Sequence, residues 1–177
     1  MKALVIGTQN SGKSTLAEEL ALRSGNGKRY YAATMIVCDD AGRERVRKHR
    51  REREGKGFIT IERGTDITGI LDGMEDARDA VVLLECMANL VGNEMYRTEC
   101  PDPEQFAESI MRDVRSVADS VGSLIIVTDE YEKDGEGYTD STRLYVKLLD
   151  LVNAKLMEYA DVVYDVRKKN SGRGAER

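Results

Sequence analysis

The chain has 177 residues, of which 33% are charged and 41% are hydrophobic, and its formal net charge at pH 7 is −5. This length fits one domain that buries a substantial core, and the acidic balance argues against a general nucleic-acid-binding protein. No apolar stretch approaches the roughly 20 residues of a membrane-spanning helix, so we expect no membrane span.

The first predicted elements are a strand, a glycine-containing loop and a helix. Residues 2–6 (KALVI) form a short apolar run, and the leucines and alanines of residues 15–22 recur at helical spacing. The octapeptide between them, GTQNSGKS, fills every fixed position of the phosphate-binding motif G-x-x-x-x-G-K-[ST]. The sequence therefore predicts a nucleotide-binding loop made of Gly7, Thr8, Gln9, Asn10, Ser11, Gly12, Lys13 and Ser14.

The chemistry of this loop follows from its residue types. Its glycines allow backbone N–H groups to converge on phosphate oxygens, and the start of the following helix adds partial positive charge. Lys13 is expected to reach the β- and γ-phosphates, and the Ser14 hydroxyl to hold Mg²⁺. A chance match in a glycine-rich turn is the alternative, and the strand and helix that flank the motif argue against it.

Apolar runs and helical patterns alternate along the rest of the chain. Strands are predicted at residues 30–34, 58–61, 80–84, 123–127 and 161–166, and helices at 39–53, 65–72, 86–97, 103–121 and 140–160. This alternation predicts an α/β fold of the three-layer α/β/α P-loop NTPase type, with a mainly parallel central sheet. We expect a single domain over residues 1–166 and a disordered polar tail over 167–177.

The cysteines and the first residues bear on localisation. Cys38, Cys86 and Cys100 are odd in number and lack C-x-x-C spacing, which indicates neither a disulfide framework nor a zinc site. The chain begins directly on a predicted strand, which leaves no room for a cleaved signal peptide. Both features favour the cytoplasm.

A second acidic group is expected near the phosphates. P-loop enzymes often place a carboxylate at the end of a neighbouring strand, where it binds Mg²⁺ directly or through water. Glu85 follows four apolar residues, and Asp129 or Glu130 follows the apolar run 124–128. Glu85 is the clearer candidate, although strand-end acids are also common helix caps. Residues 130–139 are acidic and contain glycine, which fits either a lid or a solvated connection.

The most basic stretch of the chain surrounds its one histidine. Residues 43–54 read RERVRKHRRERE, with His49 at the centre and almost no apolar face. One interpretation is a solvated charged helix with an incidental histidine. The other is a basic cluster for triphosphate oxygens, with an imidazole of pKa about 6.5 that attacks phosphorus or moves a proton. The local pattern leaves both open.

Several short motifs, taken in chain order, extend beyond the phosphate-binding loop. They are GTQNSGKS, Tyr31-Ala32-Ala33-Thr34, Asp39-Asp40, Arg45-Val46 before His49, Glu62, Leu83-Leu84-Glu85-Cys86 with Asn93, Val127-Thr128-Asp129-Glu130 and Val152-Asn153-x-x-Leu156. As an ordered set they resemble the bifunctional adenosylcobinamide kinase/adenosylcobinamide-phosphate guanylyltransferase family of cobalamin biosynthesis. The resemblance runs from residue 1 to about residue 166.

This resemblance implies two reactions at one site. The protein would phosphorylate adenosylcobinamide with ATP or GTP, and then transfer GMP from GTP to adenosylcobinamide phosphate through a guanylylated histidine. His49 matches that histidine, so His49 and Lys13 become the candidate catalytic residues, and Ser14 and Glu85 the candidate Mg²⁺ ligands. Known relatives are homotrimers. The resemblance also implies nucleotide contacts at Ala33, Thr34, Met35, Arg50, Arg51, Glu52, Arg53, Glu62 and Glu85.

The chain departs from the family pattern in places that affect the acceptor more than the nucleotide. Residues 132–138 (EKDGEGY) lack the proline of the usual loop, and Val146-Lys147 replaces an Arg-Asp pair. A divergent small-molecule P-loop kinase without guanylyltransferase activity is therefore one alternative. A nucleotide-dependent regulatory switch is a second, and it predicts slow hydrolysis without a small-molecule acceptor.

Overall fold

The computed structural model describes residues 1–37, 39–98, 102–132 and 135–166. The side chains of Ala41, Arg45, His49 and Glu52 are not among those described, although their backbone is. The predicted tail over residues 167–177 lies outside the described residues, as do Cys38 and Cys100.

The described residues form one parallel sheet of six strands, in the order β3-β2-β4-β5-β1-β6. This arrangement confirms the predicted α/β fold with a central parallel sheet. Each predicted strand is present, with ends that differ by one or two residues. The strands are β1 (Lys2–Gly7), β2 (Arg29–Ala33), β3 (Phe58–Glu62), β4 (Val81–Leu84), β5 (Ser123–Asp129) and β6 (Val162–Asp165).

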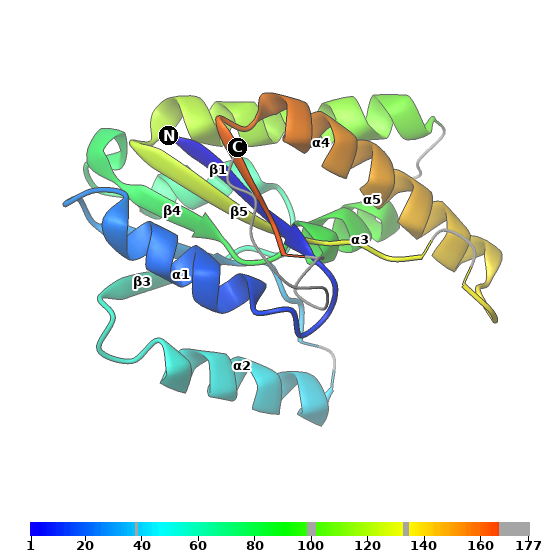
Figure 1. Ribbon diagram of the computed structural model, residues 1–177, viewed down its shortest axis with the longest axis horizontal. Coiled ribbons are helices and arrows are strands. Elements are labelled where there is room, and N and C mark those ends of the chain that lie inside the picture. The colour runs from blue at the N-terminus through cyan, green and yellow to red at the C-terminus, as the bar shows by residue number, and fades with distance from the viewer. Residues whose placement is uncertain (38, 99–101, 133–134, 167–177) are drawn as a thin grey trace.

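Helices cover both faces of the sheet (Figure 1). The α-helices are α1 (Lys13–Arg23), α2 (Asp40–Glu52), α3 (Met87–Arg97), α4 (Pro103–Ser120) and α5 (Asp140–Tyr159). Two short 3₁₀ helices, η1 (Ile67–Gly73) and η2 (Ala77–Asp79), precede β4. In Figure 1, α4 and α5 lie on one side of the sheet, and α1 and α2 lie on the other.

The 3₁₀ helix η1 differs from the α-helical pattern that we predicted for residues 65–72. Asp66 precedes it with φ +48°, in the left-handed region, so the chain enters the segment from a turn. Ile67 and Ile70 are both buried. A 3₁₀ helix has three residues per turn, so this spacing places both side chains on the core side. Apolar spacing by itself did not distinguish the two helix types.

Alternate residues of the central strands pack into separate layers of the core, as expected for a sheet buried on both faces. Leu4, Val82 and Ile126 belong to a large cluster with α3, α4, α5 and η1. Val5, Leu83 and Ile125 belong to a smaller cluster that includes Ala17 and Ala21 of α1. The ends of the strands are thereby fixed relative to one another.

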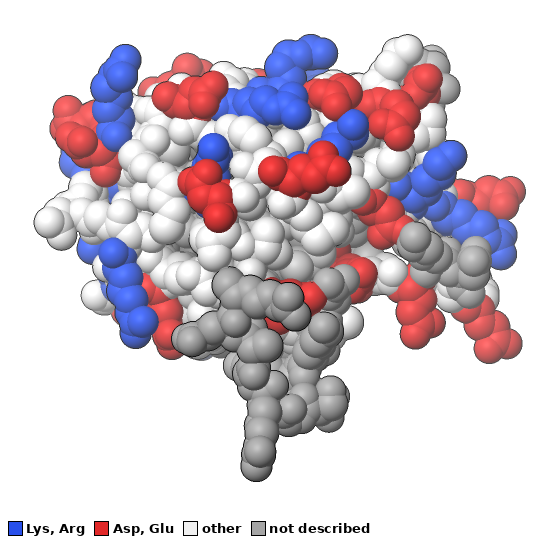
Figure 2. Space-filling model, turned by 45° about the horizontal axis from the view of Figure 1, so that its top comes forward, with Lys and Arg blue, Asp and Glu red and all other residues white. Residues whose placement is uncertain are grey.

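The surface of α4 and α5 carries ion pairs between acidic and basic side chains, not side chains of a single charge. Lys155 of α5 lies 3.4 Å from Glu104 and 2.8 Å from Glu108 of α4. Figure 2 shows acidic and basic side chains interspersed over the visible face of the molecule. Among the described residues, no helix combines the length and apolarity that crossing a bilayer requires.

Candidate active site

The predicted site residues gather at one edge of the sheet because the strands are parallel. β1 ends at Gly7, which is in register with Asp129 at the end of β5. β4 ends beside β2, and the Glu85 amide donates to the Ala32 carbonyl at 3.1 Å. In open parallel sheets, ligands bind beyond these carboxyl ends.

The loop between β1 and α1 has the backbone that its glycines allow. Gly12 has φ +87° and caps the N-terminus of α1, and Asn10 has φ +60°. A Cβ atom on Gly7 would lie 2.6 Å from Val166 Cγ2 and 2.7 Å from Ser11 Oγ, so this position requires glycine. Thr8, Gln9 and Ser14 are exposed around the loop.

Lys13 is held inside the loop by two oxygen atoms. Its side chain is buried, and Nζ donates to the Thr8 carbonyl at 2.5 Å and lies 2.8 Å from Asp129 Oδ1. Among the described atoms, the buried Ser11 Oγ has no hydrogen-bond partner. Lys13 is thus positioned within the predicted phosphate-binding loop, with a carboxylate in contact with it.

Besides Lys13, Cys86 and Asn153 contact Asp129. The Cys86 thiol lies 3.7 Å from Oδ2, and the Asn153 side chain donates to the Asp129 carbonyl at 3.0 Å. Burial, and secondarily the Asp129 charge, raises the pKa of the Cys86 thiol to about 12. The thiol therefore stays protonated at neutral pH and acts as a donor toward Asp129.

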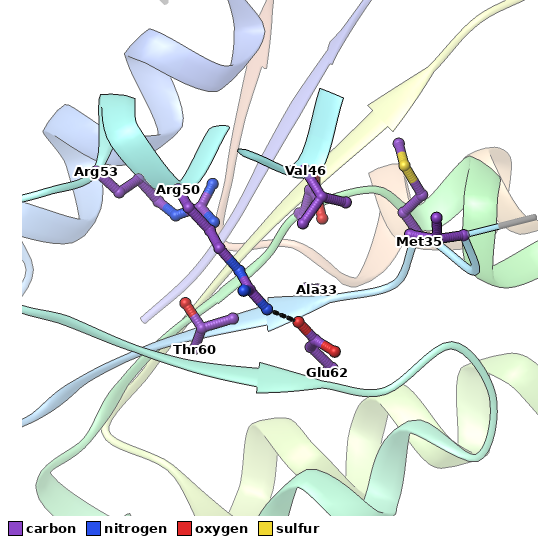
Figure 3. A pocket seen from close by; sticks show the side chains of 9 residues that line it. Ala33, Met35, Val46, Arg50, Arg53, Thr60 and Glu62 are labelled. Carbon is purple, nitrogen blue, oxygen red and sulfur yellow. Dashed lines mark hydrogen bonds and ion pairs between the residues drawn. The ribbon is translucent and has the colours of Figure 1, made fainter. Parts of the chain in front are cut away.

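A small pocket lies between α2, β2 and β3 (Figure 3). Its volume is about 40 Å³, and Figure 3 shows Arg50 pointing toward Glu62, with which it forms an ion pair. The pocket combines cationic, anionic and apolar groups, as a site for a polar ligand does. Its lining residues are Ala33, Met35, Val37, Val46, Arg50, Arg53, Thr60, Glu62 and Glu85.

Arg53 is the most unusual side chain of this pocket. It is 7% exposed, and its guanidinium lies over the Tyr31 ring at 3.4 Å from the centroid. Its Nε and Nη1 atoms have no hydrogen-bond partner in the described part of the chain. Burial, and next the Glu85 charge, raises the pKa of Tyr31. A guanidinium with open donors is suited to bind an anionic group or a carbonyl.

The structure brings most, but not all, of the predicted nucleotide contacts together. Arg51 pairs with Glu44 at 3.5 Å and lines a neighbouring shallow groove of about 650 Å³ rather than the pocket. Thr34 is buried, and its hydroxyl donates to the Cys86 carbonyl at 2.8 Å. His49 and Glu52 lie on α2, and their side chains are outside the described set. The six predicted contacts that line the pocket are Ala33, Met35, Arg50, Arg53, Glu62 and Glu85.

Three contributors to the site were not predicted as site residues, although Tyr31 and Asn93 belong to the ordered motifs. Tyr31 stacks on Arg53, Thr60 lines the pocket, and the Asn93 amide donates at 2.8 Å to the carbonyls of both Thr34 and Gly64. Strand periodicity contained a signal for two of them. Tyr31 stands two residues before Ala33, and Thr60 two before Glu62, so each pair shares a face of the sheet.

Two comparisons with known proteins agree with this geometry. A family model described as "Cobinamide kinase / cobinamide phosphate guanyltransferase" matches residues 3–169. A protein of Pseudomonas aeruginosa named "Bifunctional adenosylcobalamin biosynthesis protein CobP" is 28% identical over 130 residues. The matched segment covers 73% of this chain and 72% of that protein.

Proposed function

Because this chain belongs to the cobinamide kinase/cobinamide phosphate guanyltransferase family, we propose that its phosphate-binding loop serves both reactions and that His49 carries GMP between them. The protein is a bifunctional transferase that acts on cobinamide and on cobinamide phosphate. We assign adenosylcobinamide as the acceptor. The observation that carries the site assignment is Lys13, buried in a complete phosphate-binding motif at the same edge of the sheet as Glu85 of the Arg53 pocket.

The guanylyl step divides one displacement into two. The imidazole of His49 attacks the α-phosphorus of GTP, and pyrophosphate leaves. The phosphate of the acceptor then attacks the phosphorus of the guanylylated histidine, which gives adenosylcobinamide-GDP. Lys13 and Arg50 offset the negative charge of the leaving pyrophosphate. In the kinase step, the same loop orients the γ-phosphate toward the acceptor hydroxyl.

Ser14 and Glu85 are the side chains that we assign to Mg²⁺. Ser14 is exposed at the start of α1, and Glu85 follows β4, and both offer the oxygen ligands that Mg²⁺ prefers. When bound, Mg²⁺ neutralises charge on the phosphate oxygens. We also assign a homotrimer in the cytoplasm, by resemblance to the family.

Binding of a nucleoside in the pocket requires α2 to move. A volume of about 40 Å³ holds only a few water molecules, far less than a nucleoside needs. Gly55 and Gly57 follow α2 with φ +78° and +73°, and because glycine has no Cβ it can adopt other backbone conformations if the connection to β3 rearranges. Movement of this basic helix would bring His49 to a nucleotide held by the loop.

Incubation of the wild-type protein with Mg²⁺ and GTP should leave one GMP on the protein. A phosphoramidate bond is acid-labile, so intact-mass spectrometry at neutral pH should detect the added mass, and acid treatment should remove it. If protein that binds GTP forms no adduct but phosphorylates adenosylcobinamide, the divergent-kinase alternative is correct.

Arg53→Met tests the pocket as a nucleotide site. Met can pack on the Tyr31 ring, so the variant should keep or raise the melting temperature of the nucleotide-free protein. GTP affinity should fall about tenfold to a hundredfold, because hydrogen bonds to a charged group contribute about 1.5–3 kcal/mol. Calorimetry measures both quantities, with Arg112→Met on exposed α4 surface as the control. A lower melting temperature with unchanged GTP affinity would mean that Arg53 is structural.

A further inference from the structure

Asp129 is a carboxylate of the site that the guanylyl step leaves without a role. We propose that Asp129 is the general base of the kinase step and accepts the proton of the acceptor hydroxyl. This inference rests on the proposed function, because it assigns a residue to one of its two reactions. It goes beyond the proposed function because it assigns Asp129 to the kinase step alone.

Lys13 sets the position of this carboxylate relative to the transferred phosphoryl group. Asp129 Oδ1 lies 2.8 Å from Lys13 Nζ, and the lysine of such a loop contacts the β- and γ-phosphates. An attacking hydroxyl in line with the γ-phosphorus sits about 3–3.5 Å from it. The Asp129 carboxylate is therefore within reach of that hydroxyl once Lys13 turns to the phosphates.

The other candidate bases of the edge are less well placed. Glu85 lines the pocket beside Arg53, and it raises the pKa of Tyr31, so its carboxylate faces the α2 side of the sheet. The Cys86 thiol has a raised pKa and is a donor toward Asp129, so it cannot take up a proton at neutral pH. Asp129, by contrast, has its backbone carbonyl held by a hydrogen bond from Asn153, and its carboxylate contacts Lys13 of the loop.

Two tyrosines lie on the side of Asp129 from which, in this proposal, the large acceptor approaches. Tyr131, two residues beyond Asp129, is 40% exposed, and its ring centroid lies 6.0 Å from that of Tyr145 on α5. The Asp129 charge contributes, after burial, to the raised pKa of Tyr131, which places the phenol beside the carboxylate. Tyr145 packs on the α3–α5 layer, so this wall lies across the sheet from the Arg53 pocket.

The proposed step balances without any added reactant. The acceptor oxygen forms a bond to the γ-phosphorus, and the bond from that phosphorus to the β,γ-bridging oxygen breaks. The hydroxyl proton moves to an Asp129 carboxylate oxygen, and the nucleoside diphosphate leaves. Guanylyl transfer has no hydroxyl nucleophile: the first attack uses the lone pair of the His49 imidazole, and the second uses a phosphate that is largely ionised at pH 7 because its second pKa is about 6.

The Asp129→Asn variant tests whether only the kinase step needs this base, since the two reactions can be assayed separately. Phosphorylation of adenosylcobinamide should fall by about 10²-fold or more, within the usual range for general acid–base catalysis. Guanylyl transfer to supplied adenosylcobinamide phosphate should fall far less, by no more than the lost ion pair with Lys13 costs both reactions, and its remaining rate also reports a folded protein. Asp129→Glu should recover part of the kinase rate. Asp161→Asn, the same change at the opposite edge of the sheet, is the control and should leave both rates unchanged.

Two results would overturn the assignment. Equal losses in both reactions would mean that Asp129 supports nucleotide binding in general, and an unchanged kinase rate would mean that no base acts at this position. Failure of the proposed function is seen separately, because the wild-type protein itself would then lack one of the two activities.

Discussion

The His49→Ala variant should form no GMP adduct and should lose guanylyl transfer by about 10⁴-fold or more, as enzymes do when a nucleophile is removed. Phosphorylation of adenosylcobinamide should be largely retained, because the γ-phosphate passes directly to the acceptor in that step. Intact-mass spectrometry and separate assays with adenosylcobinamide and its phosphate measure the two effects.

Lys48→Ala is the matched control for this variant. Lys48 is the exposed neighbour of His49 on α2, and its truncation tests whether shortening a side chain of this helix affects the reactions. Equal loss of both reactions in His49→Ala would contradict a role as nucleophile. It would indicate instead that α2 supports nucleotide binding through its charge.

Lys13→Ala should impair both reactions by about 10²–10³-fold each, the usual cost of removing one preorganised electrostatic donor from a transition state. Both reactions use the loop, because the GTP of the guanylyl step and the nucleotide of the kinase step each place a triphosphate there. The variant also removes the ion pair at 2.8 Å with Asp129 and leaves that carboxylate without its cation. Isotope-labelled GTP and ATP allow the two transfers to be followed in one preparation.

Lys28→Ala provides the control for Lys13→Ala. Lys28 is exposed and pairs with Glu75 far from the loop, and an exposed ion pair contributes little to stability. A Lys13→Ala protein that lost only one reaction would show that the two nucleotides occupy different sites. The single-loop model would then be wrong.

The sequence by itself determined the features that arise from local patterns. The octapeptide at residues 7–14 predicted the loop between the first strand and the first helix, because its glycines permit the turn and its flanks favour a strand and a helix. Continuous apolar runs predicted the parallel strands, since strands buried on both faces need them. The ordered motifs also identified the family, which the match over residues 3–169 confirms.

The tertiary structure decided which of the two acidic residues at strand ends lies near which basic side chain. In the sequence, Glu85 and Asp129 both end apolar runs, and the local pattern favoured Glu85 as the acid near the phosphates. The strand order places β5 beside β1, so Asp129 at the end of β5 contacts Lys13. Glu85, which follows β4, lines the pocket of Arg53 instead. Strand order depends on how crossover connections pack their helices on the sheet, and a single strand's residues do not encode it. The same packing stacks Arg53 on Tyr31 and turns the Thr34 hydroxyl into the protein interior.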